Sequence, residues 1–296
     1  MANLRQLSLP PIPISGTLVL PSKHDSKMPA VVMMHGSAGV TDREFSLWGT
    51  LLNEMGIAAF IVDSFTPRGI KETTHDQSQV SDFAGVADAF SALQVLAARQ
   101  DIDPNRIGVM GFSKGGIVSL QTIWEPFRRG IISDNLRFAA HIPFFPSCIR
   151  QTWSKSISTA PVLLLVGEKD DYTHAEPCVQ YAERIQQLGG NSQTIVYPNA
   201  YHGFEAEPGS FVWGPKVQTF STCPTVEAEI GEWRWHRAQP IENDPNESNY
   251  NFGKMKCWSY GAHSGNHPAS NAREQSQKDV KVFLTKTFSI TINKNP

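Results

Sequence analysis

From about residue 16 to residue 200, short apolar runs alternate with segments in which apolar side chains recur every three or four residues. The first pattern is typical of buried strands and the second of amphipathic helices. The predicted strands are Gly16–Leu20, Pro29–Met34, Ile57–Val62, Arg106–Met110, Phe138–Ile142, Pro161–Val166 and Thr194–Tyr197. The predicted helices are Phe45–Met55, Phe83–Ala97, Gly115–Trp124 and Val179–Leu188. This alternation predicts an α/β fold with a mostly parallel central sheet flanked by helices.

The alternation stops after His202. Residues 205–268 contain Pro, Gly, Asn and Ser throughout and sustain neither period, and a last helix is expected over Ala269–Thr287. We interpret 205–268 as an irregular insertion in a single domain, 1–296. Because it begins beside His202 and contains several tryptophans, we expect it to form a lid or a wall over a pocket. A small satellite core, or the interface of a homodimer, is the alternative. The tryptophans are Trp213, Trp233, Trp235 and Trp258.

The charge of the chain is nearly balanced, with 26 Lys and Arg against 28 Asp and Glu. Neither sign forms a long block, so neither nucleic acid nor a membrane surface is an expected partner. The sequence contains no apolar run long enough for a signal peptide or a membrane span. We therefore expect a soluble chain, cytoplasmic by default.

Four cysteines could change that expectation about the compartment. Cys148 follows one predicted strand and Cys178 opens the helix after the next, so parallel strand ends could bring the two together. Cys223 and Cys257 both lie in the insertion, where a bridge would restrain a segment with little regular structure. Paired cysteines would point to a periplasmic or secreted protein, whereas free buried thiols are the alternative.

The strongest chemical signal is Gly111-Phe112-Ser113-Lys114-Gly115, a G-x-S-x-G between a predicted strand and a predicted helix. In that context a sharp turn exposes the serine hydroxyl, and glycines avoid collisions around it. Ser113 is therefore our candidate nucleophile, and a plain helix N-cap is the alternative.

A serine hydroxyl needs a base, and the base needs an orienting acid. Both are expected downstream, on loops that follow later strands. Asp170 follows one predicted strand and His202 follows the next, so we assign them as acid and base. Asp171 is the competing acid.

The oxyanion of a tetrahedral intermediate needs two backbone N–H donors. One is expected from Lys114, which follows the nucleophile, and the other from Ser37, in the small-residue loop that begins at His35. Ala38 is the alternative to Ser37. We interpret His35 as a brace for the loop rather than as a second base.

Aromatic side chains on loops after the strands are expected to line the substrate pocket. Arg68 could supply a positive charge near it, or could equally hold Asp63 or backbone carbonyls in place. The histidines lack metal-binding spacings and no phosphate-binding loop is present, so we expect neither a metal nor a cofactor. The aromatic candidates are Phe65, Phe144, Phe145, Tyr172 and Tyr201.

These residues resemble the dienelactone hydrolase family of the α/β-hydrolases, over about residues 16–204 and the last helix. The resemblance rests on five segments: Met34–Ser37, Asp63–Gly69, Gly108–Gly116, Gly167–Asp171 and Tyr197–Phe204. It implies a triad on Ser113, His202 and Asp170 that hydrolyses a lactone or ester without a cofactor.

This chain departs from the family pattern at three positions. It has Ser113 where the family prototype has a cysteine nucleophile, and Gly36 where the prototype has a glutamate. It also has Ala206 where the prototype has an arginine that holds the substrate carboxylate. Serine-esterase chemistry on a small-molecule ester or lactone other than an anionic dienelactone is therefore expected.

Three other functions use the same residues or the same scaffold. They are acyl transfer to an alcohol, hydrolysis of small peptides or amides, and non-catalytic binding on a hydrolase scaffold. A binding protein would be expected to have lost a triad residue, and all three candidates are present.

Overall fold

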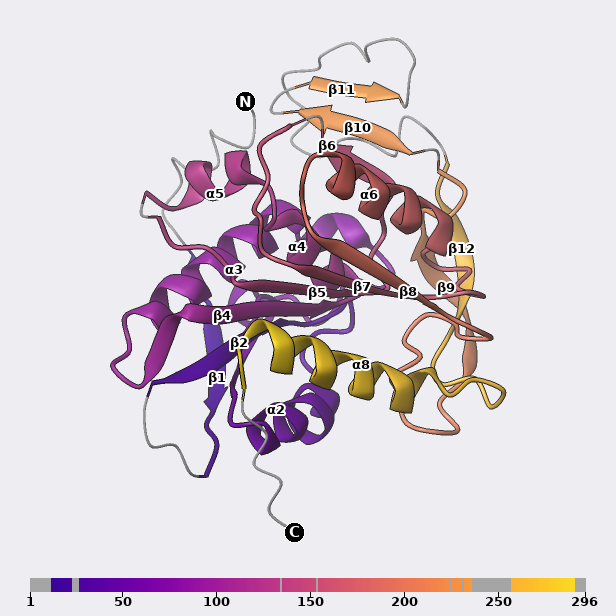
Figure 1. Ribbon diagram of the computed structural model, residues 1–296. Coiled ribbons are helices and arrows are strands. Elements are labelled where there is room, and N and C mark those ends of the chain that lie inside the picture. Colours follow the sequence, from indigo (N-terminus) through magenta and orange to yellow (C-terminus); the bar gives the residue numbers. More distant parts are fainter. Residues whose placement is uncertain are drawn as a thin grey trace.

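The computed structural model describes residues 12–22, 27–133, 135–152, 154–223, 225–229, 232–235 and 257–290. Its strands and helices alternate along the chain as the sequence predicts, and they build the predicted α/β-hydrolase fold (Figure 1).

Within the described residues the central sheet has seven strands in the order β1-β3-β2-β4-β5-β7-β8. Only β1 is antiparallel to its neighbour, β3, and the other adjacent pairs are parallel. In a parallel sheet the carboxyl ends of the strands meet at one edge, where the loops that follow them lie together. The strands are β1 (Ser15–Val19), β2 (Met28–Met34), β3 (Ala58–Asp63), β4 (Ile102–Phe112), β5 (Ala140–Phe144), β7 (Val162–Gly167) and β8 (Ser192–Tyr197).

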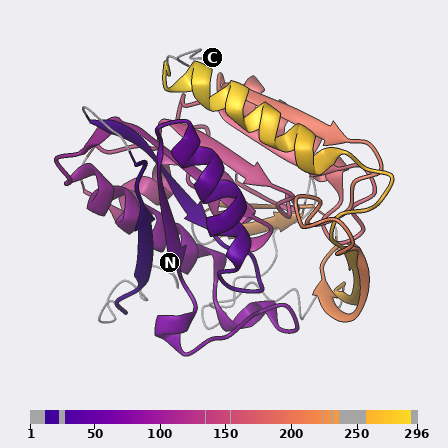
Figure 2. The ribbon, with the colours of Figure 1, turned by 90° about the horizontal axis from the view of Figure 1, so that it is seen from below.

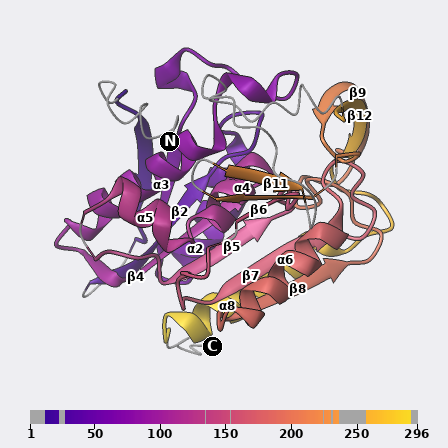
Figure 3. The ribbon, with the colours of Figure 1, turned by 90° about the horizontal axis from the view of Figure 1, so that it is seen from above.

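Helices cover both faces of this sheet, so its central strands read as continuous apolar runs. All residues of β2 and β7 are buried. Figure 1 shows α2 and α8 on one side of the sheet and α3, α4 and α6 on the other; Figures 2 and 3 view these two sides. The helices are α2 (Thr50–Glu54), which continues a π-helical turn at Glu44–Gly49, α3 (Asp82–Ala97), α4 (Lys114–Gln121), α5 (Glu125–Ile131), α6 (Ala175–Gln187) and α8 (Ala272–Thr287).

The insertion is more regular than the sequence indicates. Strand β9 (Val212–Thr219) pairs antiparallel with β12 (Ser259–Ser264), more than 30 residues later in the chain. Strands β10 (Val226–Glu229) and β11 (Glu232–Trp235) form a hairpin, and β10 pairs parallel with β6 (Arg150–Thr152) in the body. Gly214 and Pro215 interrupt the apolar pattern of β9, so the spacing of its apolar residues does not predict a strand there. Residues 236–256, and the side chains of Trp233 and Trp235, lie outside the described residues.

Both cysteine pairs suggested by the sequence are disulfides. Cys148–Cys178 joins the loop after β5 to the first turn of α6. Cys223–Cys257 joins the end of β9 to the start of β12, and it packs on Ile149, next to Cys148 in the chain. Two bridged pairs indicate an oxidising compartment, so the default expectation of a cytoplasmic protein is not supported.

Among the helices in the described ranges, none combines the length and the apolar character that crossing a membrane requires.

Removal of the Cys148–Cys178 bridge by the double substitution Cys148→Ala and Cys178→Ala is expected to destabilise the protein. The bridge closes a chain separation of 30 residues, and a loop of that length corresponds to a loss of about 3–4 kcal/mol in the free energy of unfolding. Urea titration of the wild type and the double variant measures this difference. Peptide mapping under non-reducing conditions that finds four free thiols in protein from its native compartment would contradict it.

His141 makes stability depend on pH. It is fully buried on β5, and burial lowers its pKa to about 4. The unfolded chain therefore binds a proton at higher pH than the folded chain does, so stability falls as the pH drops from about 6.5 towards 4.

Between pH 7 and pH 4, the wild type is expected to lose about 3 kcal/mol more unfolding free energy than His141→Gln. Denaturant titrations at the two pH values provide the comparison. An equal loss in the wild type and His141→Gln would contradict the assignment.

Candidate active site

The backbone at Ser113 makes the sharp turn that the motif predicts. Ser113 has φ 53° and ψ −111°, between the last residue of β4 and the first of α4. This conformation is strained for any residue with a Cβ, and it aims the side chain out of the turn. A Cβ on Gly111 would lie 2.0 Å from the carbonyl oxygen of Gly115, and one on Gly115 would lie 2.0 Å from that of Met34. The two glycines are therefore required by the packing of the turn.

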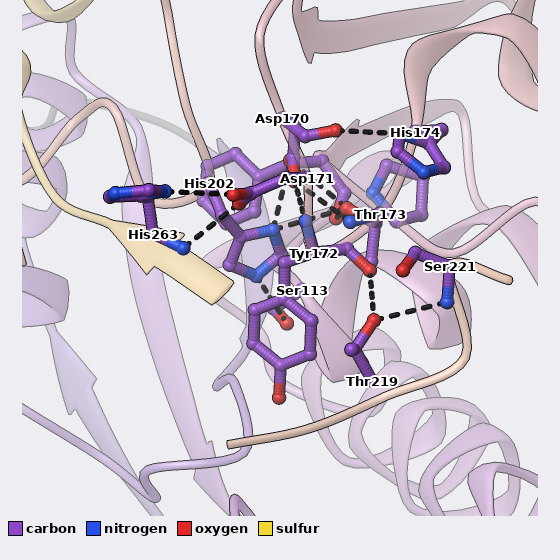
Figure 4. A network of polar contacts seen from close by, with 12 residues as sticks. Ser113, Asp170, Asp171, Tyr172, Thr173, His174, His202, Thr219, Ser221 and His263 are labelled. Atoms are coloured by element: carbon purple, nitrogen blue, oxygen red, sulfur yellow. Dashed lines mark hydrogen bonds and ion pairs between the residues drawn. The ribbon is translucent and has the colours of Figure 1, made fainter. Parts of the chain in front are cut away.

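The side chains of Ser113, His202 and Asp170 form a continuous hydrogen-bonded chain (Figure 4). His202 Nε2 lies 2.8 Å from Ser113 Oγ, and His202 Nδ1 lies 2.9 Å from Asp170 Oδ2. Asp170 follows β7 and His202 follows β8, so neighbouring parallel strands bring them to the same edge as Ser113. The backbone N–H of Lys169 donates to Ala200 O at 2.9 Å, which ties the two loops together.

Asp170 is almost completely buried and is surrounded by donors. Its Oδ1 accepts from the backbone N–H groups of Tyr172 and Thr173 at 2.9 and 2.7 Å. Its Oδ2 faces His202 Nδ1 and also accepts from the hydroxyl of Thr173 at 3.0 Å. These bonds fix the orientation of the carboxylate.

Asp171 has a different partner. Both of its carboxylate oxygens bond to His263, one to the backbone N–H at 2.9 Å and the other to Nδ1 at 2.8 Å (Figure 4). Asp171 therefore holds β12 of the insertion, and the structure brings Asp170 rather than Asp171 to His202.

The loop after β2 passes against Ser113. A Cβ on Gly36 would lie 3.3 Å from Phe112 O and 3.6 Å from Ser113 Cβ, so glycine allows this close approach. Ser37 follows on this loop, and its carbonyl accepts from the N–H of Thr73 at 2.7 Å. Lys114 is the first residue of α4, where helical N–H groups have no partner within the helix.

His35 braces this loop. Its Nε2 accepts from the backbone N–H of Ser64 at 3.1 Å, so Nδ1 carries the proton and donates to Gly36 O at 2.8 Å. Burial lowers its pKa, which favours this neutral form. Both ring nitrogens are occupied, as a bracing role requires.

The ammonium group of Lys114 is held by Asp82 and by a backbone carbonyl. Its Nζ lies 3.1 Å from Asp82 Oδ1 and bonds Gln77 O at 3.2 Å. Burial alone would raise the pKa of Asp82, but Arg150 and Lys114 lower it overall. Lys114 therefore helps to balance a buried carboxylate and leaves only its backbone N–H for an oxyanion.

Three of the six predicted pocket residues lie close to the site. The rings of Tyr172 and Phe145 pack on the imidazole of His202, with centroids 4.4 and 4.8 Å away. Phe65 packs on His35 and lines a cavity of about 20 Å³, together with Asp82 and Lys114.

The structure does not bring the side chains of the other three to Ser113. Phe144 is fully buried in the core against Trp48, because its position on β5 turns it inward. Tyr201 packs instead on Phe211, at the edge of the insertion. The guanidinium of Arg68 is held by both oxygens of Asp88, at 2.7 and 2.8 Å, so it offers no free charge to a substrate.

Gln77 and Thr173 are site residues that the sequence did not single out. Gln77 Oε1 accepts from Ser37 Oγ at 3.0 Å, its Nε2 donates to the hydroxyl oxygen of Tyr172 at 3.1 Å, and its backbone N–H donates to Gln218 Oε1 at 3.0 Å. It therefore joins the loop after β2, the loop after β7 and the insertion. A threonine three residues after a candidate acid is a usable sequence signal for a side-chain bond to that acid. No motif or spacing in the sequence around Gln77 indicates that it lies at the site.

The fold, with a serine, a histidine and a carboxylate at the carboxyl edge of the sheet, defines an α/β-hydrolase. The model of the dienelactone hydrolase family matches residues 14–221. The chain belongs to this family and is a carboxylic ester hydrolase.

Two relatives in sequence are distant from this chain. It is 22% identical over 186 residues to a Bradyrhizobium protein named probable 2-oxo-3-(5-oxofuran-2-ylidene)propanoate lactonase, covering 60% of this chain and 74% of that protein. It is 28% identical over 195 residues to the uncharacterized protein YfhR of Escherichia coli K12, covering 60% of this chain and 64% of YfhR. The matched region thus spans less than two thirds of YfhR.

A solved structure supports the fold. The propionate-bound thermophilic esterase Est2 of the Planctomycetes species Thermogutta terrifontis superposes with a TM-score of 0.53 at 19% identity, covering 67% of this chain and 82% of that one.

Proposed function

We propose that the protein is a serine hydrolase that cleaves small, uncharged carboxylic esters or lactones through an acyl-enzyme. The observation that carries this proposal is the unbroken chain of contacts from Ser113 Oγ through His202 to Asp170, at 2.8 and 2.9 Å. These separations are within the range required for proton transfer between a nucleophile and its base.

In the first half-reaction, Ser113 Oγ attacks the carbonyl carbon while its proton passes to His202 Nε2. Asp170 stabilises the resulting imidazolium through Nδ1–H and stays ionised. His202 then gives the proton to the departing alkoxide as the ester C–O bond breaks, which leaves an acyl group on Ser113. In the second half-reaction His202 takes a proton from water, which attacks the acyl carbon. The bond between the acyl carbon and Ser113 Oγ then breaks, His202 returns the proton to Ser113 Oγ, and the acid is released.

We assign the oxyanion hole to the backbone N–H groups of Lys114 and Ser37. The start of α4 supports Lys114, since its N–H also benefits from the positive end of the helix dipole. The close passage of the Gly36 loop beside Ser113 supports Ser37.

The preference for an uncharged substrate rests on the ion pairs that two cationic side chains, Arg68 and Lys114, already make. The guanidinium of Arg68 is committed to Asp88, and the ammonium of Lys114 to Asp82. An anionic substrate would have to compete with these buried carboxylates.

We propose that the chain is a single domain and that strands β9 and β12 of its insertion, 205–268, form a fixed wall of the pocket rather than a moving lid. Gly265 N donates to His202 O at 2.7 Å, Gln218 N donates to Thr74 O at 3.0 Å, and Thr219 Oγ1 donates to Tyr172 O at 2.8 Å. With the bridge at Cys223–Cys257, the insertion is fastened on several sides. The bridges also support a periplasmic or secreted location.

Ser113→Ala and His202→Ala are each expected to lower kcat by at least a thousandfold with little change in unfolding free energy, since triad members act as a unit. Hydrolysis of p-nitrophenyl acetate measures this, and mass analysis after fluorophosphonate treatment should find the label on Ser113. Near-normal turnover by Ser113→Ala would refute the mechanism.

The two neighbouring aspartates provide a matched pair. Asp170→Asn is expected to lower kcat by at least a hundredfold, whereas Asp171→Asn should retain turnover within about tenfold, because Asp171 bonds His263 rather than His202. The reverse order of the two effects would identify Asp171 as the acid.

Gln218→Ala is expected to change the relative kcat/KM for acetate, butyrate and octanoate esters by several-fold, because it breaks the bond between the wall and Gln77. Its melting temperature should fall by no more than about 4 °C, as expected for the loss of one hydrogen bond of about 1 kcal/mol. Lys216→Ala, on an exposed position of the same strand, is the control and should leave the acyl preference unchanged. If Gln218→Ala instead lowers kcat/KM equally for all three esters, in proportion to the fall in melting temperature, the insertion stabilises the fold and does not determine the acyl preference.

A further inference from the structure

The hydroxyl of Thr173 lies at the centre of a cluster that the triad mechanism does not use. Thr173 Oγ1 is 3.0 Å from Asp170 Oδ2, 3.1 Å from His202 Nδ1 and 3.1 Å from Phe145 O (Figure 4 shows the first two residues around it). One side chain thus contacts the acid, the base and the backbone of the loop after β5.

The protons on His202 and on the Thr173 hydroxyl determine which hydrogen bonds Thr173 can form. His202 Nε2 must be unprotonated to accept the Ser113 proton, so Nδ1 carries the ring proton. That N–H points between Asp170 Oδ2 and Thr173 Oγ1. The single proton of Thr173 can go to Asp170 Oδ2 or to Phe145 O, and a lone pair on Oγ1 remains for the N–H in either case.

The imidazole has few other restraints on its rotation. Tyr172 and Phe145 pack on its ring, but such contacts permit sliding in the ring plane, whereas the bonds at Nδ1 define a direction. Asp170 Oδ1 keeps two backbone donors of its own, while Oδ2 has a side-chain donor in Thr173. Loss of the Thr173 hydroxyl would therefore act on the oxygen that orients the base.

We propose that Thr173 is a positioning residue of the triad, whose hydroxyl donates to Asp170 Oδ2 and accepts from His202 Nδ1–H, so that it fixes the carboxylate and the imidazole relative to each other. This proposal rests on the triad assigned above. Thr173 does not touch the substrate and transfers no proton along the reaction path. It keeps Nε2 aligned with Ser113 Oγ and adds a second acceptor for Nδ1–H when the imidazolium forms.

The test compares Thr173→Val, which replaces the hydroxyl by a methyl group of similar shape, with Thr173→Ser, which retains it. With p-nitrophenyl acetate, Thr173→Val is expected to lower kcat about 10- to 100-fold, as for the loss of a hydrogen bond to a charged group, while KM changes less than about twofold. Thr173→Ser should recover kcat to within about threefold of the wild type. The low-field proton resonance of His202 Nδ1–H should move in Thr173→Val and stay in place in Thr173→Ser.

A matched control exists elsewhere in the sheet. Thr122 Oγ1 donates to Ser119 O at 2.7 Å and lies 3.0 Å from Nδ1 of the buried His141, so Thr122→Val removes the same group beside a histidine outside the site. It should affect stability and leave kcat unchanged. If Thr173→Val does not fold, Thr173→Ala removes the same hydroxyl without added bulk.

The outcomes separate this proposal from the triad itself. If Ser113→Ala is inactive while Thr173→Val turns over like the wild type, or while Thr173→Ser is as impaired as Thr173→Val, the positioning role is refuted and the triad stands. If Ser113→Ala remains active, the triad fails, and the role of Thr173 fails with it.

Discussion

The strained backbone at Ser113 is the constraint on which the site depends. A positive φ at a non-glycine residue is costly, and it persists only where the surrounding structure leaves no alternative. Here Gly115 packs against the end of β2 and Gly111 packs against Gly115, so the turn cannot relax without separating α4 from the sheet. The rigidity of the parallel sheet thus determines where the hydroxyl lies, and the loops that carry His202 and Asp170 only have to reach that point.

The two adjacent carboxylates of Asp170 and Asp171 bond to different parts of the structure around Ser113. Asp170 turns inward to the imidazole, while Asp171 turns outward to His263 on β12. The loop after β7 is therefore held on both sides, by His202 and by the insertion. Gln77 makes a similar connection between the loop after β2 and β9. The insertion therefore helps to hold the loops that carry Asp170 and Ser37 in place.

The sequence predicted the fold well, because buried parallel strands and their covering helices have clear apolar periods. It also indicated Ser113, since the motif has meaning only between a strand and a helix, as found here. The choice between Asp170 and Asp171 depends on His263, a contact 92 positions away that no local pattern records. Loop position does not give the direction of a side chain, so it did not predict that Phe144 is buried in the core. For Arg68 the sequence left two roles open, and the structure shows a bond to the backbone carbonyl of Ser64, together with the ion pair to Asp88 that no local pattern indicates. Strand β9 was missed because it pairs with β12 over a long chain separation and is interrupted by Gly214 and Pro215, whereas β10 and β11 are only four residues long each and show little periodicity.

The bridge between Cys223 and Cys257 determines what a break in the chain would do. The two cysteines are 34 positions apart, yet their Cα atoms are 4.9 Å apart. Because the bridge joins the two ends of this stretch directly, a single cut between them would leave β9 and β12 linked through sulfur. A change in the length of the stretch also has to preserve a second attachment, since β10 lies within it and pairs with β6 in the body.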